Sequence, residues 1–402
     1  MTIGITSDIH LGDDECKLVR ADGLAPAYAA FRDRLRAAAG GAPLRYLILN
    51  GDILDFAVAS FDKAFVRAKV LFRALARDRL AEEIIYIPGN HDKYVWDAVE
   101  WEVNVIRRLK APGDKDPRPF ARTQPGVIDT RKTPALTLPD ISYVKGASRY
   151  GTLFLEGLFE PGNVLPINVV YPNLYIRTNS DTMLVSHGHM LENAWVLLSR
   201  FLRHEPELGG EPGIKELEEH NVPVTSLLCT AVGQAGRVSQ IFAQISTESK
   251  RGCATRLERL LDRVLPELEE MIALPWPLEF LDNIGLRLAR RMILRAARNT
   301  VDARYDPVFF QHASVWTRLK EFYAATCLQA RALELPAPRR VIFGHTHEPI
   351  PASAPLDTRT HAGGGELALE LYNTGGWLGE PGKSAEVFFL DGNGTLSSVN
   401  IQ

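Results

Sequence analysis

Short apolar runs that end abruptly in polar, glycine-containing clusters recur along this chain. They span residues 3–7, 46–50, 84–88, 183–186 and 341–343. Runs of this length, rich in isoleucine, valine, leucine and tyrosine, are typical of strands that are buried on both faces. We therefore expect these five runs to form buried strands.

Helical patterns separate the first of these strands, and alternating patterns close the chain. Residues 24–39 carry apolar side chains at helical spacing and precede two glycines, and residues 61–80 indicate a second helix. Alternation of strands and helices predicts an α/β core. Residues 367–372 and 386–390 alternate like strands, and the DGNG turn at 391–394 predicts a hairpin. We expect a mixed sheet that finishes with antiparallel strands.

Two segments look like additions to this core. Residues 110–139 hold six prolines and many charges, which predicts a long surface loop or lid. Residues 190–336 are mostly helical in pattern. We therefore expect a discontinuous core, residues 1–189 and 337–402, interrupted by a mainly helical insert or lid at residues 190–336.

One stretch of the expected insert has the pattern of an amphipathic helix. Between residues 286 and 298, five arginines fall on one side of a helix and apolar side chains on the other. Such a helix could contact a membrane peripherally or admit a lipid chain, or it could pack on the core with its arginines paired to glutamates. The N-terminus does not have the pattern of a signal peptide, and no apolar run is long enough to span a bilayer. We expect a cytoplasmic protein.

Charge and cysteine usage narrow the choice of partners. The 46 basic and 49 acidic residues give a net charge of -3, so nucleic acid is not an expected partner. The four cysteines are far apart, which excludes a zinc knuckle and a disulfide framework. The chain contains neither a GxxxxGK[ST] loop nor a nucleophile elbow, so kinase-like transfer and serine hydrolysis have no support.

Chemistry-bearing side chains directly follow each predicted strand. In chain order they are Asp8 and His10, then Asp52 and Asp55, then Asn90, His91 and Asp92, then His187 and His189, and finally His345 and His347. Ligands of open α/β sheets gather at the carboxyl ends of strands, so these clusters can converge on one site. Imidazole, carboxylate and amide oxygen suit divalent ions such as zinc, iron or manganese. A structural zinc site needs four ligands, and the surplus here is enough for two ions that share a carboxylate.

The motifs DxH, GDxxD, GNHD, HGH and GHTH, in this order, resemble the calcineurin-like metallophosphoesterase family. The matching segments cover roughly residues 1–190 and 337–402 and leave the insert unexplained. The resemblance implies a sandwich of mixed β-sheets flanked by helices. It also implies an enzyme that hydrolyses a phosphomonoester, phosphodiester or pyrophosphate bond by metal-activated hydroxide.

The resemblance further assigns a role to each residue. One divalent ion, manganese, zinc or iron, would be held by Asp8, His10, Asp52 and His347, and a second by Asp52, Asn90, His187 and His345, with Asp52 bridging. His91 would stabilise the developing charge and protonate the leaving oxygen, oriented by Asp92. Asp55 would fix a ligand imidazole, or could simply cap the following helix. His189 could replace His187 as a ligand, contact substrate, or have a structural role.

Three segments point to a particular branch. SDIHLG, GHTHEP and NTGGW resemble the branch that contains UDP-diacylglucosamine hydrolases of bacterial lipid synthesis, whose helical insert accepts acyl chains. A phosphorylated small molecule or a lipid-linked substrate is therefore expected. This chain departs from that branch in having His91 where arginine is typical, and in its longer insert. The alternatives are a metal-dependent nuclease and a non-catalytic binding scaffold on the same fold. The oligomeric state stays open.

Overall fold

The computed structural model describes most of the chain outside the centre of the expected insert. The described residues are 1–113, 116–138, 153–202, 212–226, 309–360, 367–379 and 384–401, with a few between 255 and 263. The chain divides into two compact units, one formed by Met1–Gln234 with Pro307–Gln402 and the other by Ala235–Asp306. The basic helix expected at residues 286–298 lies outside the described residues. All elements below belong to the larger unit.

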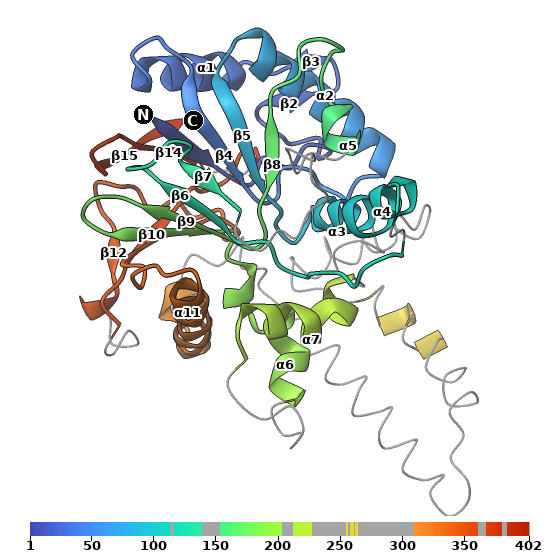
Figure 1. Ribbon diagram of the computed structural model, residues 1–402, viewed down its shortest axis with the longest axis vertical. Helices are drawn as coiled ribbons and strands as arrows, with labels where there is room; N and C mark the ends of the chain where they lie inside the picture. Colours follow the sequence, from blue (N-terminus) through green and yellow to red (C-terminus); the bar gives the residue numbers. More distant parts are fainter. Residues whose placement is uncertain are drawn as a thin grey trace, which may run out of the picture. The chain divides into compact units, whose positions relative to one another are not determined.

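The described strands of this unit form two large sheets and a short hairpin (Figure 1). The first sheet has the order β15 (Leu396–Ile401), β14 (Ala385–Leu390), β1 (Ile3–Thr6), β4 (Leu44–Asn50), β5 (Ala81–Ile87), β8 (Ile167–Val169). The second has the order β12 (Leu356–Asp357), β13 (Glu370–Asn373), β11 (Arg340–Phe343), β10 (Thr182–Ser186), β9 (Asn173–Arg177), β6 (Gly126–Asp129), β7 (Leu136–Thr137). The hairpin is β2 (Val19–Arg20) with β3 (Gly23–Leu24).

The central strands of both sheets are parallel. In the first sheet β1, β4, β5 and β8 run parallel, while β14 and β15 add antiparallel strands at one edge. In the second sheet β10, β11 and β13 run parallel, and β9 is antiparallel to β10. The prediction of a mixed sheet that finishes with antiparallel strands is therefore confirmed. The carboxyl ends of β1, β4 and β5 share one edge, as do those of β10 and β11.

Alternate residues of the central strands enter two different cores. Ile5 and Ile48 of the first sheet pack with Val185 of the second in the core between the sheets. Leu47, the neighbour of Ile48, packs instead with Phe31 on the helical side of the first sheet. Because these strands are buried on both faces, their sequences are continuous apolar runs rather than alternating ones.

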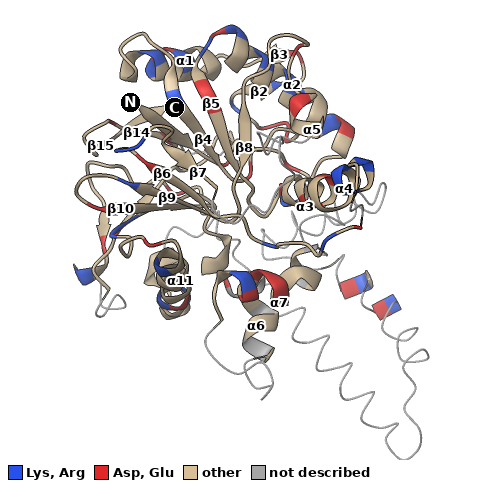
Figure 2. Cartoon of the chain, in the orientation of Figure 1, with Lys and Arg blue, Asp and Glu red and all other residues tan. Residues whose placement is uncertain are grey.

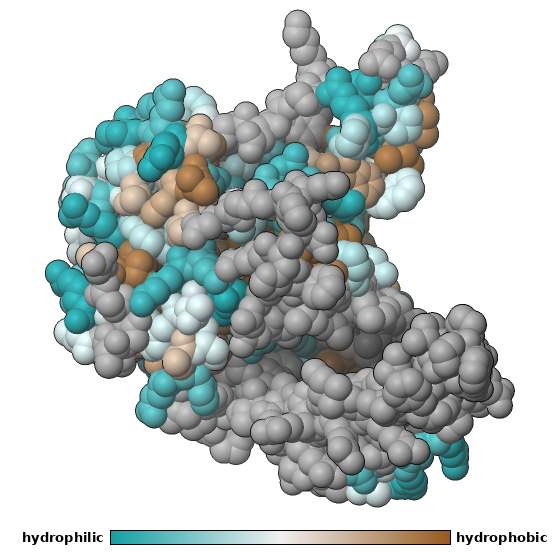
Figure 3. Space-filling view, turned by 90° about the horizontal axis from the view of Figure 1, so that it is seen from below, coloured by the Kyte–Doolittle hydropathy of each residue, from teal (hydrophilic) through white to brown (hydrophobic). Residues whose placement is uncertain are grey.

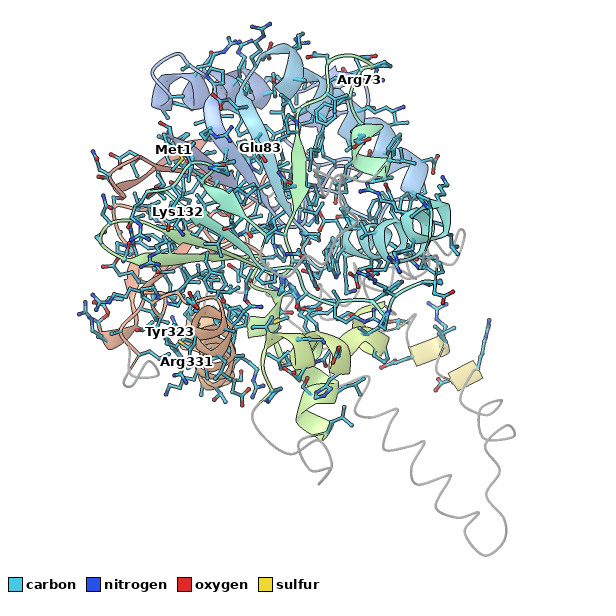
Figure 4. The ribbon with its side chains drawn as sticks, viewed as in Figure 1. Met1, Arg73, Glu83, Lys132, Tyr323 and Arg331 are labelled. Carbon is cyan, nitrogen blue, oxygen red and sulfur yellow. The ribbon has the colours of Figure 1, made fainter. Side chains whose placement is uncertain are left out.

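The larger unit also contains helices, some of which lie on the outer faces of the sandwich. They are α1 (Ala27–Ala38), α2 (Phe61–Arg77), α3 (Tyr94–Trp101), α4 (Arg107–Lys110), α5 (Leu153–Glu156), α6 (Leu197–Leu202), α7 (Ile214–Ser226) and α11 (Ala313–Ala332). Figure 1 shows α1 and α2 beside the first sheet and α11 beside the second. The Tyr323 hydroxyl on α11 donates to the carbonyl of Pro338 at 2.9 Å, which ties this helix to the start of β11 (Figure 4).

The prediction of a loop or lid throughout residues 110–139 is wrong. Gly126–Asp129 forms β6, which pairs parallel with β9 and antiparallel with β7, so this stretch belongs to the second sheet. The six prolines of this segment make its sequence resemble that of a loop. The partner strand β9 lies far along the chain, so its pairing leaves no local signal.

The described part of residues 190–336 contains helices of the larger unit. These are α6, α7 and α11, and Figure 2 shows that α7 carries both acidic and basic side chains. The boundaries of the insert at residues 190 and 336 stay a prediction. Among the described residues, no helix has the length and apolar character that crossing a membrane requires. On the face seen in Figure 3, the described surface includes both hydrophilic (teal) and hydrophobic (brown) residues.

Candidate metal centre

The loops that follow five strands are joined by hydrogen bonds across the two sheets. The Asp8 amide, after β1, donates to the carbonyl of Gly51 after β4 at 2.9 Å. The His345 amide, after β11, donates to both carboxylate oxygens of Asp8 at 3.0 Å. All seven predicted ligands are buried: Asp8, His10, Asp52, Asn90, His187, His345 and His347. Residues far apart in sequence thus meet at the edge where the strands end, as predicted.

A first cluster contains one carboxylate and two imidazoles. Asp8, His10 and His347 offer ligand atoms that lie within 4.8 Å of one another. The Nε2 atoms of His10 and His347 are 3.1 Å apart, and Nε2 of His347 is 3.3 Å from Oδ1 of Asp8. Three ligand atoms converging at this spacing can hold one divalent ion.

A second cluster lies beside the first. Asp52, His187 and His345 also offer ligand atoms within 4.8 Å of one another. Nε2 of His187 is 3.2 Å from Oδ2 of Asp52 and 3.0 Å from Oδ1 of Asn90. The amide oxygen of Asn90 therefore belongs to this cluster, which has the donor types expected for a second ion.

Asp52 connects the two clusters. Its Oδ1 accepts a hydrogen bond from the amide of His91 at 2.8 Å, which fixes the carboxylate. Its Oδ2 lies 3.2 Å from Nε2 of His187 in the second cluster and 4.0 Å from Nε2 of His10 in the first. One carboxylate oxygen thus faces ligand atoms of both clusters.

Buried polar atoms without partners test whether these residues fit metal ions. Among the described residues, Oδ2 of Asp52 and both ring nitrogens of His345 are buried and have no hydrogen bond. A buried polar atom without a partner costs about 1–3 kcal/mol, and more when charged. Coordination of a cation would satisfy these atoms, so the residues fit a pair of divalent ions.

The backbone at this site is held in an uncommon conformation. Eight described residues other than glycine have a positive φ, and five of them are predicted ligands: Asp8, His10, Asp52, His345 and His347, with φ between 51° and 67°. This conformation costs about 1–3 kcal/mol per residue and persists where the surroundings enforce it. Five of the eight positive φ values fall in the ligand loops, which indicates that the fold maintains backbone strain at a functional site.

Two glycines of the motifs are required by close packing. A side chain at Gly51 would collide with the ring of His187, and one at Gly89 would collide with the carboxylate of Asp52. Gly51 also has a φ of 84°, which other residues rarely adopt. The glycines of GDxxD and GNHD therefore let the ligand loops approach one another.

Asp55 orients two imidazoles. Its Oδ2 lies 2.8 Å from Nδ1 of His10, and its Oδ1 lies 2.9 Å from Nδ1 of His91. Oδ1 also accepts hydrogen bonds from the amides of Ala57 and Val58 at 3.1 Å, so Asp55 caps a turn as well. The interpretation of Asp55 as a cap of the following helix is wrong, because α2 begins at Phe61 after Ser60 and the turn at Ala57 and Val58 precedes it.

The prediction that Asp92 orients His91 is wrong, because Asp55 contacts Nδ1 of that ring. Asp92 instead accepts hydrogen bonds from the backbone of the GDxxD loop and its own loop. The donors are the amides of Asp52, Ile53, Leu54 and Gly89, with the hydroxyl of Tyr86. A carboxylate close in sequence to His91 is therefore used to hold the loop, and one 36 residues earlier holds the ring.

Charges within the site keep its carboxylates ionised. Burial raises the pKa of Asp52, but the imidazoles of His187 and His91 outweigh it and lower that pKa well below the usual value. Burial lowers the pKa of His187, but Asp52 and Asp8 outweigh it and raise that pKa to about 9. The carboxylates thus attract positive charge strongly, and bound metal ions would satisfy that attraction.

His189 lies beside the centre rather than in either cluster. Its ring centroid is 5.8 Å from that of His187 and 6.2 Å from that of Trp195. Burial, together with the neighbouring His187 and His345, lowers the pKa of His189 well below its usual value. The neutral, buried ring of His189 therefore packs against the ligand His187 and against Trp195.

The NTGGW segment supports the ligand loops. Asn373 donates to the carbonyl of Gly344 at 2.8 Å, and the Trp377 amide donates to the carbonyl of Asp8 at 2.9 Å. The Thr374 hydroxyl contacts that of Ser7, which in turn contacts the Asp8 carboxylate. Ser7 was not singled out in the sequence, although its place between the first strand and Asp8 was a signal.

Asn50 and Glu192 were also missed. The Nδ1 of His187 lies 3.1 Å from the carbonyl of Asn50, and Oε2 of Glu192 lies 3.4 Å from Nε2 of His345. A backbone carbonyl carries no sequence signal. Glu192 lies outside all five motifs, so nothing local distinguished it from other glutamates of the expected insert.

Comparison with known proteins shows the family of this chain. Residues 1–222 match the family model for calcineurin-like phosphoesterases, and no curated protein matches the chain. Among solved structures, the chain is similar to a dimetal phosphatase from Danio rerio, with 11% sequence identity, coverage of 100% of this chain and 98% of that chain, and a TM-score of 0.31. The family match covers more than half of the 402 residues and includes four of the five motifs. The chain belongs to the calcineurin-like phosphoesterase family, whose members are metal-dependent phosphoester hydrolases.

Proposed function

We propose that this protein hydrolyses a phosphomonoester, phosphodiester or pyrophosphate bond with two divalent ions held by its seven clustered ligands. The observation that carries the proposal is Oδ2 of Asp52, which is buried, has no hydrogen bond and faces both clusters. A carboxylate shared by two ions would hold them close enough to act together on one phosphoryl group.

The ligands divide between the ions as follows. Asp8, His10, Asp52 and His347 would hold one ion, and Asp52, Asn90, His187 and His345 the other. Mixed oxygen and nitrogen donors admit manganese, zinc or iron. When bound, such ions polarise a phosphoryl oxygen and make water a stronger nucleophile at neutral pH.

His91 would donate a proton to the leaving oxygen, and its contacts support this role. Its Nδ1 lies 2.9 Å from Oδ1 of Asp55, so the Asp55 carboxylate can accept the Nδ1–H. Its Nε2 lies 4.0 Å from Oδ2 of Asp52, at the edge of the metal centre. Asp55 therefore holds the ring so that Nε2–H faces the reacting group. As the P–O bond breaks, the leaving oxygen takes this proton, and His91 is left neutral.

The family and the branch resemblance support a phosphorylated substrate. A phosphorylated small molecule or a phosphorylated lipid-linked compound would bind beside the ions. By the branch resemblance, the segment at residues 190–336 would be the part of the chain that accepts an acyl chain or contacts a membrane peripherally. An acylated substrate should then bind more tightly than its deacylated form, with a lower Michaelis constant.

A metal-dependent substrate panel tests the proposal. The protein is loaded with manganese, zinc or iron and assayed on a chromogenic monoester, a chromogenic diester, nucleotide anhydrides and single-stranded DNA. Asp52→Asn should lose more than about 100-fold in turnover, since even outer partners of ligands contribute 10–100-fold. It should also retain fewer than two ions per chain by elemental analysis.

A matched control is Asp33→Asn, because Asp33 is an exposed aspartate on α1 with 61% of its side chain accessible. This variant should behave as wild type. Full activity and unchanged metal content in Asp52→Asn would overturn the proposal. Cleavage of DNA alone would identify a nuclease. Absence of both activity and bound ions in the wild type would identify a scaffold.

A further inference from the structure

Each ligand imidazole of a metal centre needs an outer hydrogen-bond acceptor that fixes which ring nitrogen carries the proton. His10 and His187 each have such an acceptor. Nδ1 of His10 lies 2.8 Å from Asp55, and Nδ1 of His187 lies 3.1 Å from the carbonyl of Asn50. In both rings Nε2 is thereby left to face the cluster.

His345 is different, because neither ring nitrogen has a hydrogen bond among the described residues although the ring is only 5% exposed. Its backbone amide is fixed by two contacts with Asp8, so the side chain is anchored at its base. An unpartnered ring at this place requires both a ligand on one nitrogen and an acceptor for the proton on the other.

Glu192 lies where such an acceptor is needed. It stands between two short helical turns, His189–Leu191 and Asn193–Val196, directly after the HGH motif. Its Oε2 is 3.4 Å from Nε2 of His345, and 24% of its side chain is exposed. The indole Nε1 of Trp195 donates to the same oxygen at 3.1 Å and holds it in place.

The two clusters of candidate ligand atoms indicate that Glu192 is an outer partner rather than a ligand. Among the described residues, Asp52, His187 and His345 form a group of ligand atoms within 4.8 Å of one another, and Glu192 is not part of it. Its carboxylate therefore contacts the ring of His345 without joining the cluster.

We infer that Glu192 accepts the Nε2–H of His345 and thereby presents Nδ1 of that ring to the second ion. Glu192 is a positioning residue, since it acts through His345. The inference rests on the proposed function, because it presumes a metal ion at Asp52, His187 and His345. It places a residue outside the five motifs, at the start of the expected insert, in control of the affinity of one ion.

Metal titration of variants tests this inference. Glu192→Ala removes the acceptor, and Glu192→Gln keeps an acceptor oxygen without the charge. Glu82→Ala is the matched control, because Glu82 is an exposed glutamate on β5 with 53% of its side chain accessible. The readout is the affinity for each of two manganese ions by calorimetry, with the metal content measured independently.

We expect Glu192→Ala to bind one ion about 10–100-fold more weakly and the other normally, as found for outer partners of metal ligands. Glu192→Gln should fall between Glu192→Ala and wild type, and Glu82→Ala should match wild type. Equal affinities for both ions in Glu192→Ala and wild type would overturn the inference. Equal weakening of both ions in Glu192→Gln, in a protein whose thermal unfolding is unchanged, would also overturn it.

A crystal structure of the manganese-loaded wild type gives a second test that does not depend on a variant folding. Nδ1 of His345 should face the ion, with Nε2 within hydrogen-bond distance of Glu192. Coordination through Nε2, or by Glu192 itself, contradicts the inference. A wild type that binds fewer than two ions refutes the proposed function, whereas two ions with unchanged affinities in Glu192→Ala refute only the role of Glu192.

Discussion

At the scale of single residues, the candidate site is defined by side chains whose partners are not their neighbours in sequence. His91 is the clearest case, since its amide donates to Asp52 and its ring contacts Asp55. Burial raises the pKa of Asp55, but the rings of His91 and His10 outweigh it and lower that pKa well below the usual value. An ionised Asp55 is therefore available to accept the Nδ1–H of either ring.

The role of His91 can be separated from metal binding. We expect His91→Asn to lower turnover by about 10²–10⁴-fold, the range for a general acid, with both ions retained. The loss should shrink for substrates whose leaving group needs no proton, such as nitrophenolate. Turnover of an alkyl and a nitrophenyl phosphate, with metal content, checks this. An equal loss on both substrates would show that His91 stabilises charge or orients substrate instead.

At the scale of elements, the loops after β4 and β5 form one unit around Asp92. This carboxylate accepts hydrogen bonds from amides of both loops and from the hydroxyl of Tyr86. Burial and the neighbouring Asp52 raise the pKa of Asp92. The backbone donors compensate in part, and they keep the loop that carries Asp52 in its left-handed conformation.

Removal of Asp92 should therefore damage the fold more than the acid step. We expect Asp92→Ala to lower the free energy of unfolding by at least about 3 kcal/mol, because several buried donors lose a charged acceptor. Bound metal should fall with it. Chemical denaturation and elemental analysis measure both. A stable variant that keeps two ions and loses only turnover would return Asp92 to a catalytic role.

Helix α7 carries a buried carboxyl group, that of Glu218. Oε2 of Glu218 accepts a hydrogen bond from the hydroxyl of Tyr171 at 2.7 Å, and Oε1 has no partner among the described residues. Burial raises the pKa of Glu218 from 4.5 to about 7. A raised pKa means that the folded state disfavours ionisation. Stability from the neutral form is present below pH 4.5 and is lost as pH rises through about 7.

Glu218→Gln should remove this dependence, because an amide stays neutral at every pH and can still accept from Tyr171. Across that window the wild type should lose up to about 3 kcal/mol of stability relative to the variant, at about 1.4 kcal/mol per pKa unit. Denaturant unfolding of both proteins below and above the window measures the difference. Parallel pH profiles for the two proteins would contradict the prediction.

At the scale of the whole molecule, one compact unit is built from both ends of the chain. Met1–Gln234 and Pro307–Gln402 share this unit, and the strands β1 with β14 and β10 with β11 pair across them. The hydrogen bonds from His345 to Asp8 join the same two pieces at the metal centre. The candidate site therefore depends on sheet pairing between segments that the intervening chain separates.

Limited proteolysis should reveal this organisation. We expect the first cuts to fall within Ala235–Asp306, because the other unit contains both sheets. The two core fragments should stay associated in size-exclusion chromatography and keep two ions, since strand pairing holds them together. Dissociation into separate stable halves, or early cleavage within β6 and β9, would argue against one core.

The sequence by itself determined the central strands, the order of the motifs and the types of ligand. These are local properties, because a doubly buried strand needs a continuous apolar run and a ligand loop needs its polar residues directly after it. The family match, the mixed sheets and the two ligand clusters agree with them. The second sheet was predicted less fully, since β6, β7 and β9 are short and the pairing of β6 with β9 joins segments that are far apart in the chain.

The tertiary structure alone decided which side chain serves which ring. Asp92 is the neighbour of His91 in sequence, yet Asp55 contacts its ring, and Glu192 contacts His345 from outside every motif. Such pairings depend on strand register and on the left-handed turns after β1, β4 and β11, which set where each side chain starts and points. Neither the strand register nor the direction of these turns leaves a pattern along the chain, because both are set when the two sheets pack.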